Sequence, residues 1–218
     1  MLIAAHQPNF LPNLGFFYKI AKADIFIIIT NIQFEKHEGW QQRHKIKGPN
    51  NDIWLTVPVI GSQNQKIKEV GINNLVNWRK QHKRSLELSY SKTKEKVILE
   101  DLFKIYDQPW ERLVDLNIAI ISYLKEILTI KTPVILDEEI YGEKEKLLIN
   151  ICKKYNANGY LSGVGAKKYM KKKYFLEMEK NAISHCFIDK NLTTLYPYST
   201  IHYLLNNGRK EVLKLIEI

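Results

Sequence analysis

An unbroken apolar run near the start of the chain, Ile25-Phe26-Ile27-Ile28-Ile29, places the strongest constraint on the fold. A strand with one face in water alternates apolar and polar residues, whereas a continuous apolar run is buried on both faces. Such strands are typical of parallel sheets that carry helices on either side. Residues 24–30 therefore predict an inner strand of a parallel sheet in an α/β protein.

Strand-like and helix-like segments alternate along the rest of the chain. The strand-like segments are residues 2–5, 24–30, 54–59, 134–136, 160–162 and 183–188. The helix-like segments are residues 14–22, 77–90, 94–106, 110–128, 144–155, a stretch from about 166, and 202–205, before a basic amphipathic tail. This order predicts one α/β domain over residues 1–218, with a mostly parallel sheet in three layers. Residues 33–68 are expected to leave the sheet as an excursion, and residues 33–130 could form an inserted or helical lobe.

The cysteine content and the apolar segments indicate where such a chain resides. Cys152 and Cys186 are the only cysteines, and they have no metal-like spacing, which favours a reducing compartment. Met1 leads directly into the first predicted strand, without the pattern of a signal peptide. No apolar stretch approaches the roughly 20 residues of a membrane span. We therefore expect a cytoplasmic protein without a membrane span.

The formal net charge of +10 has three explanations. The chain binds nucleic acid, it binds a phosphorylated small molecule, or it has a lysine-rich surface without a specific partner. Basic residues are spread along the chain, and clusters such as Lys171-Lys172-Lys173 lack interleaved aromatic residues, which disfavours nucleic acid. We expect an anionic small-molecule substrate, such as a nucleotide sugar or an acyl donor. The oligomeric state stays open.

The loop after the first strand is the leading candidate for a site. It begins at His6 and carries Gln7 and Asn9, while Pro8 and Pro12 restrict its backbone. Ligands of open α/β sheets bind outside the carboxyl ends of the strands, where this loop is expected. The alternative is a turn whose polar groups satisfy one another.

A second candidate follows the strand at 24–30. It runs over residues 33–46 and would leave the same edge of the sheet as the first loop. Arg43 and Lys45 could hold a phosphate or carboxylate, and Trp40 could stack on a base or a sugar. The alternative is a solvated hairpin.

Three further patterns give weaker signals. Trp78 and His82 share one face of a predicted helix, although a histidine in that position is more often structural. His37 and His44 lie near acidic residues, but their spacing matches no known metal site, so we expect no metal. The turn that contains Gly163 and Lys167 follows a strand and could form an anion seat at a helix start, without matching a known glycine-rich motif.

In this order, the motifs resemble the WbqC-like family, a bacterial group found with genes for O-antigen and other surface polysaccharides. The resemblance covers nearly the whole chain and is carried by residues 6–12, 15–17, 23–24, 33–34, 40–46, 54–59, 77–80, 115–117, 160–163, 165–167 and 196–197. It implies a role in making or tailoring unusual sugars, for instance by transfer of an acyl or aminoacyl group to an amino sugar. The chain departs from the family pattern at Asn31 and in a shortened segment after Tyr196-Pro197 that reaches His202 early.

The opening of the chain is also similar to nucleotidylyltransferase-fold enzymes, a group that includes pantothenate synthetase. This second likeness implies a Rossmann-like or nucleotidylyltransferase-like sheet, and possible use of ATP with Mg²⁺. Those enzymes carry a paired-histidine signature that ends in Gly-His. In this chain Gly15 is followed by Phe16, so the second imidazole is missing.

The resulting hypothesis is a transferase that acylates or aminoacylates an activated sugar or amino-acid intermediate. His6 is the predicted general base or charge stabiliser for the attacking amine, because an imidazole titrates near neutral pH. The predicted substrate-binding residues are Gln7, Asn9, Gln33, Trp40, Arg43, Lys45, Trp78, His82, Gly163 and Lys167. The alternatives are an ATP-dependent ligase that forms an acyl-adenylate, and a non-catalytic partner that binds a sugar nucleotide.

Overall fold

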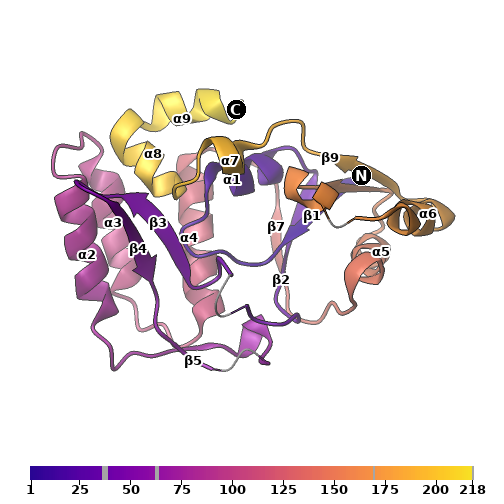
Figure 1. Cartoon of the computed structure of the whole chain (residues 1–218), viewed down its shortest axis with the longest axis horizontal. Helices are drawn as coiled ribbons and strands as arrows, with labels where there is room; N and C mark the ends of the chain where they lie inside the picture. The colour runs from indigo at the N-terminus through magenta and orange to yellow at the C-terminus, as the bar shows by residue number, and fades with distance from the viewer. Residues whose placement is uncertain (36–38, 62–63, 169, 218) are drawn as a thin grey trace.

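The computed structural model describes residues 1–35, 39–61, 64–168 and 170–217, and in this part of the chain a five-stranded sheet forms the centre of the molecule (Figure 1). Its strands run in the order β7-β2-β1-β8-β9, and every neighbouring pair is parallel. The strands are β1 (Leu2–His6), β2 (Ile25–Ile29), β7 (Val134–Asp137), β8 (Gly159–Ser162) and β9 (Ser184–Phe187). The apolar run of β2 lies between β1 and β7, so the predicted inner strand and the parallel α/β fold are confirmed.

Helices cover both faces of the sheet and make it a three-layer structure. Because side chains alternate along a strand, Ala4 and Phe26 face one core while Ile3 and Ile27 face the other. The first core is closed by α1 (Leu14–Ala21), α4 (Leu113–Ile127) and α8 (Thr200–Asn207). The second is closed by α5 (Lys144–Lys154) and α6 (Lys172–Lys180).

The strand order reverses on the two sides of β1. From β1 the chain moves outward through β2 to β7, and it then returns to place β8 and β9 on the opposite side of β1. Right-handed crossovers that run in opposite directions put their helices on opposite faces, as α1 and α5 show. Loops that leave β1 and β8 therefore diverge, and a crevice opens between them at the carboxyl ends of the strands.

The excursion lies between β2 and β7, which are adjacent in the sheet. Figure 1 shows its hairpin and the helices α2 and α3 together, at the opposite end of the molecule from α6. Its elements are β3 (Arg43–Lys47), β4 (Asp52–Thr56), β5 (Val59–Ile60), η1 (Ile67–Glu69), β6 (Gly71–Ile72), α2 (Trp78–Ser89), α3 (Lys96–Tyr106) and α4.

Two segments differ from the prediction. The strand expected over 54–59 is interrupted: β4 ends at Thr56 and β5 begins at Val59, because Pro58 has no backbone N–H for a continued ladder. Residues 43–47 overlap the second candidate segment, for which a hairpin was the alternative interpretation. They form β3 and pair with β4 in an antiparallel hairpin.

The C-terminal part folds into short helices. α7 (Leu192–Leu195) was not predicted, α8 contains the helix predicted at 202–205, and α9 (Arg209–Leu215) lies in the predicted amphipathic tail. Gly15 allows α7 to approach α1, since a Cβ at this position would lie 2.9 Å from the backbone nitrogen of Thr193. The Asn13 side chain caps α1 by accepting a hydrogen bond from the Phe16 amide at 3.1 Å.

The loop after β1 is held in place by a buried side chain of α4. Asn117, which is fully buried, donates to the carbonyl oxygens of Pro8 at 2.9 Å and of Gln41 at 2.7 Å. The Phe10 amide also donates to the Trp40 carbonyl at 2.9 Å. One amide group thus joins two loops that are far apart in the sequence, and both loops end in the candidate site.

Replacing Asn117 with Ala should destabilise the fold by roughly 2 to 4 kcal/mol, because two buried carbonyl groups lose their donor. The free energy of unfolding in urea measures this effect. Gln81→Ala, on the exposed side of α2, is the matched control and should change stability by less than about 0.5 kcal/mol. Equal stability of the two variants would contradict the anchoring role.

Candidate functional site

A cavity of about 680 Å³ opens where the carboxyl ends of β1, β2 and β8 meet. Its wall includes His6 of β1, Ile29 of β2 and Ser162 of β8, together with the loop after β1 and the first turns of α1 and α5. It lies at the reversal of the strand order, and small-molecule sites occupy roughly 300 to 1,000 Å³. Position and size therefore make this cavity the candidate site.

Several predicted residues meet in the wall of this cavity. They are His6, Gln7, Asn9, Trp40 and Gly163, which come from three separate segments of the chain. Trp40 is 38% exposed and contacts the rings of His44 and Trp54. The cavity mouth therefore continues onto the aromatic surface of the β3–β4 hairpin.

Other predicted residues lie on the hairpin or beside it, outside the described cavity wall. The Arg43 guanidinium lies 4.9 Å from the centre of the Trp54 ring. Lys45 pairs with Asp52 at 3.1 Å. Gln33 is exposed and forms an isolated bridge with Lys66.

Trp78 and His82 are buried in the core and are not part of the cavity wall. Their rings pack against Tyr106, and His82 also contacts Phe10. The Nε2 atom of His82 lies 3.1 Å from the Thr56 carbonyl oxygen, and burial lowers the pKa of this histidine to about 4. The contacts of this pair are those of packed core residues.

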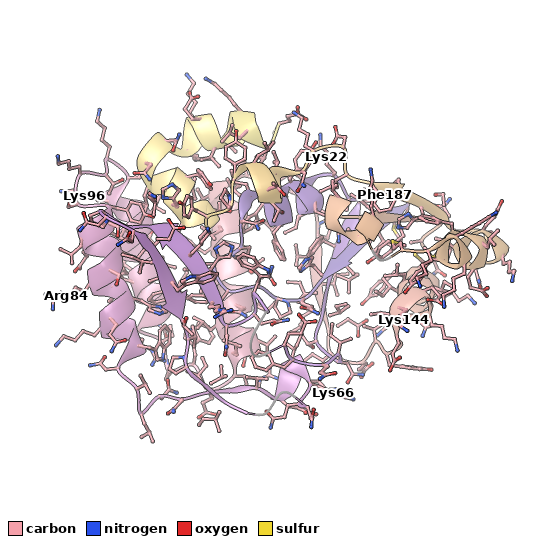
Figure 2. All side chains as sticks on the ribbon, viewed as in Figure 1. Lys22, Lys66, Arg84, Lys96, Lys144 and Phe187 are labelled. Atoms are coloured by element: carbon pink, nitrogen blue, oxygen red, sulfur yellow. The ribbon has the colours of Figure 1, made fainter. Side chains whose placement is uncertain are left out.

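The segment after β8 differs from the predicted helix start. Val164–Lys168 forms a short 3-10 helix, η2, and α6 begins only at Lys172. Gly163 and Gly165 disfavour an α-helix at this point, so the turn opens the 3-10 helix η2 and the α-helix expected from about residue 166 is not formed there. Lys167 is exposed on η2, with its ammonium 5.0 Å from the centre of the Phe187 ring (labelled in Figure 2).

The sequence reasoning missed Lys19, a buried lysine in the cavity wall. Its side chain is 7% exposed, and Nζ donates to the carbonyl oxygen of Ala5 at 2.7 Å. Burial lowers the pKa of Lys19 to about 8. A lysine three residues after Phe16, on the buried side of a predicted apolar helix, was the signal that could have revealed it.

His6 is neutral at pH 7 in this environment. Its pKa is lowered to about 4, first by burial and then by the charge of Lys19, while a hydrogen bond to the Gln7 carbonyl opposes the shift. Nδ1 lies 2.9 Å from that carbonyl oxygen. Because a carbonyl only accepts, Nδ1 carries the proton and Nε2 is the basic nitrogen.

A serine–histidine pair adjoins the cavity. Ser162 ends β8 in the cavity wall, and its Oγ lies 2.9 Å from Nε2 of His185 on β9. Burial, and to a smaller extent the charge of Lys19, lower the pKa of His185. The sequence could not reveal this pair, because it depends on the pairing of two strands.

The charged side chains of the described cavity wall are basic. Lys19 lies inside and the exposed Lys144 lies at the start of α5, while no carboxylate is part of this wall. Other basic residues labelled in Figure 2 (Lys22, Lys66, Arg84 and Lys96) project from separate places around the molecule. The cavity therefore favours an anionic ligand, and the remaining positive charge is dispersed.

Comparison with known proteins agrees with the motifs in the sequence. The model of the WbqC-like protein family matches residues 7–206. The chain belongs to the WbqC-like family. It is 34% identical over 182 residues to the uncharacterized protein Rv1507c of Mycobacterium tuberculosis, which covers 81% of this chain and 78% of the relative. No solved structure matches the chain.

The described part of this WbqC-like protein contains neither a metal-binding cluster of side chains nor a membrane-spanning helix. Within the described ranges, no three His, Cys, Asp or Glu side chains are grouped so that they could hold a metal ion. His37 lies outside the described residues. The helices of the described chain are too short or too polar to span a membrane.

Lys19 makes the stability of the fold depend on pH in a specific direction. Its native pKa of about 8 lies below its unfolded value of 10.5. This pKa difference corresponds to about 3 kcal/mol in the free energy of unfolding. The penalty for the buried charge is fully present below pH 8 and is relieved as the native state loses its proton between pH 8 and 10.5. Relative to Lys19→Met, the wild type should therefore gain stability over this interval.

Urea unfolding at a series of pH values measures this difference. Lys80→Met, at an exposed position on α2, is the control and should run parallel to the wild type. A constant difference between the wild type and Lys19→Met across the interval would show that Lys19 keeps an ordinary pKa.

Proposed function

We propose that this WbqC-like protein is a transferase that moves an acyl or aminoacyl group from an activated donor to the amine of a sugar or amino-acid intermediate, in the synthesis of surface polysaccharide or a related product. The supporting observation is a basic cavity that contains a neutral imidazole, His6, beside a buried ammonium, Lys19. Amide formation needs a base for the attacking amine and a positive charge near the developing oxyanion.

His6 acts as the base in this proposal. With Nδ1 held by the Gln7 carbonyl, Nε2 accepts the proton that the amine loses as the new C–N bond forms. A pKa of about 4 makes His6 a weaker base than an ordinary histidine, but it keeps Nε2 unprotonated at every physiological pH. Asn9 and Gln7 orient the acceptor from the same loop.

Lys19 and Lys144 supply the positive charge for the anionic part of the substrates. Lys19 is desolvated, so its interaction with a phosphate or an oxyanion is stronger than that of a surface lysine. Trp40 offers a flat face at the mouth for a sugar or a base. Arg43, with Trp54, extends this surface beyond the cavity.

A ligand screen followed by product analysis tests the proposal. Nucleotide-linked amino sugars, acyl-CoAs, amino acids and ATP with Mg²⁺ are tested for a rise in melting temperature, since a bound ligand stabilises the native state. Stabilising pairs are then incubated together, and mass spectrometry detects an acylated sugar. Product that requires ATP and releases pyrophosphate would assign the ligase mechanism, and binding of a sugar nucleotide without product would assign a non-catalytic role.

His6→Ala should lower turnover by roughly a hundredfold, because the base is lost while the cavity remains. The melting curve should stay close to that of the wild type. Glu87→Ala, exposed on α2, serves as the control for the substitution itself and should keep full turnover. Full activity of a folded His6→Ala variant would exclude the role of this histidine.

The pH profile of kcat/KM should show limits near 4 and near 8 instead of an inflection near 6.5. The acid limit reflects His6, which must be neutral, and the alkaline limit reflects Lys19, which must be charged. Lys19→Arg stays charged at all these pH values, so an active variant should lose the alkaline limit. An inflection near 6.5 that disappears in His6→Ala would contradict the assigned environment of His6.

A further inference from the structure

We propose that Ser162 is the nucleophile that carries the acyl group between donor and acceptor, with His185 as its base. This inference rests on the proposed transferase function and specifies its mechanism. It assigns a role to two residues that were not among the predicted site residues.

The Ser162 hydroxyl is placed at the carboxyl end of an inner strand. Ser162 is 4% exposed, yet it forms part of the cavity wall, together with His6 and the segment after β8. The next residue is Gly163, and a Cβ built there would meet no atom within 4 Å. The cavity is therefore open at the residue that directly follows Ser162.

Aromatic neighbours fix the orientation of the His185 ring. Tyr160 stacks on it at 6.1 Å between centroids, and Phe175 and Phe187 contact it edge-on at 5.3 and 4.8 Å. This packing directs Nε2 to the Ser162 hydroxyl at 2.9 Å, within the range expected for a nucleophile and its base. A neutral imidazole can accept the hydroxyl proton as the serine attacks.

Lys19 supplies the positive charge for this step. Lys19 and Ser162 both line the cavity, and the charge of Lys19 contributes to the lowered pKa of both His6 and His185. Lys19 gives one hydrogen bond, to Ala5, in the described structure, and an ammonium has three donors. It can therefore stabilise an oxyanion or an anionic leaving group formed at Ser162.

The reaction balances without a further reactant. The Ser162 oxygen attacks the carbonyl carbon of a thioester or an acyl phosphate, its proton passes to His185 Nε2, and the leaving group departs as an anion with the bonding electron pair. The amine then attacks the seryl ester and gives its proton to His6 Nε2, which releases it to solvent. The C–N bond forms, the C–O bond to serine breaks, and His185 returns the proton to the serine oxygen.

The test uses p-nitrophenyl acetate as an activated acyl probe with the full chain. The wild type should gain the mass of one acetyl group, and peptide mapping should place it on Ser162. Ser162→Ala should abolish this label, and His185→Gln should slow its formation at least tenfold. Ser184→Ala, whose hydroxyl on β9 donates to Asn158, is the matched control and should be labelled like the wild type.

His6→Ala tests the second half-reaction, because the acetyl-enzyme of this variant should pass its acetyl group to an added amine at least tenfold more slowly than that of the wild type. Ser162→Cys keeps a nucleophile at this position and should form a thioester there. This variant tests the proposal even if Ser162→Ala does not fold. Equal labelling of Ser162→Ala, or label on Lys19, would overturn the inference.

The substrate pair identified by the product analysis distinguishes failure of this inference from failure of the proposed function. Amide formation at the wild-type rate by Ser162→Ala would leave a transferase with direct attack and remove the acyl-enzyme. Absence of both the acetyl-enzyme and any amide product would remove the transferase function together with this inference.

Discussion

The reversal of the strand order at β1 is the constraint on which the site depends. With β2 and β7 on one side of β1 and β8 and β9 on the other, the crossover helices lie on opposite faces, and the loops at the carboxyl ends separate. The cavity occupies this separation. The position of the cavity therefore follows from the path of the chain through the sheet and does not depend on particular side chains.

Burial of Lys19 lowers the stability of the fold but favours the binding of an anion at the site. An ammonium with 7% exposure is unfavourable for folding, and a single hydrogen bond to Ala5 offsets only part of this penalty. The same desolvation strengthens its attraction for an anion. Its charge adds to the effect of burial in lowering the pKa of His6 and of His185. A bound anion would restore the missing partner, so ligand binding and stability are linked at this residue.

Prediction from the sequence succeeded where the signal was local. The apolar run of β2 indicated a parallel sheet, and the strand-to-loop transition at His6 identified one segment of the cavity wall. It placed Trp78 and His82 in a candidate site although they pack in the core, since an aromatic residue on a helix has the same pattern in either environment. It missed Lys19, because a lysine in a helix is read as solvated unless its neighbours across space are known.

By itself, the sequence determined the family, the parallel α/β fold and the loop that carries His6, because apolar periodicity and ordered motifs are properties of contiguous residues. The tertiary structure alone decided which distant residues meet. The Ser162–His185 pair requires β8 to lie beside β9, and the lowered pKa of His6 requires burial next to Lys19. Hydrogen bonding and desolvation act across space, so these properties arise only when the chain is folded.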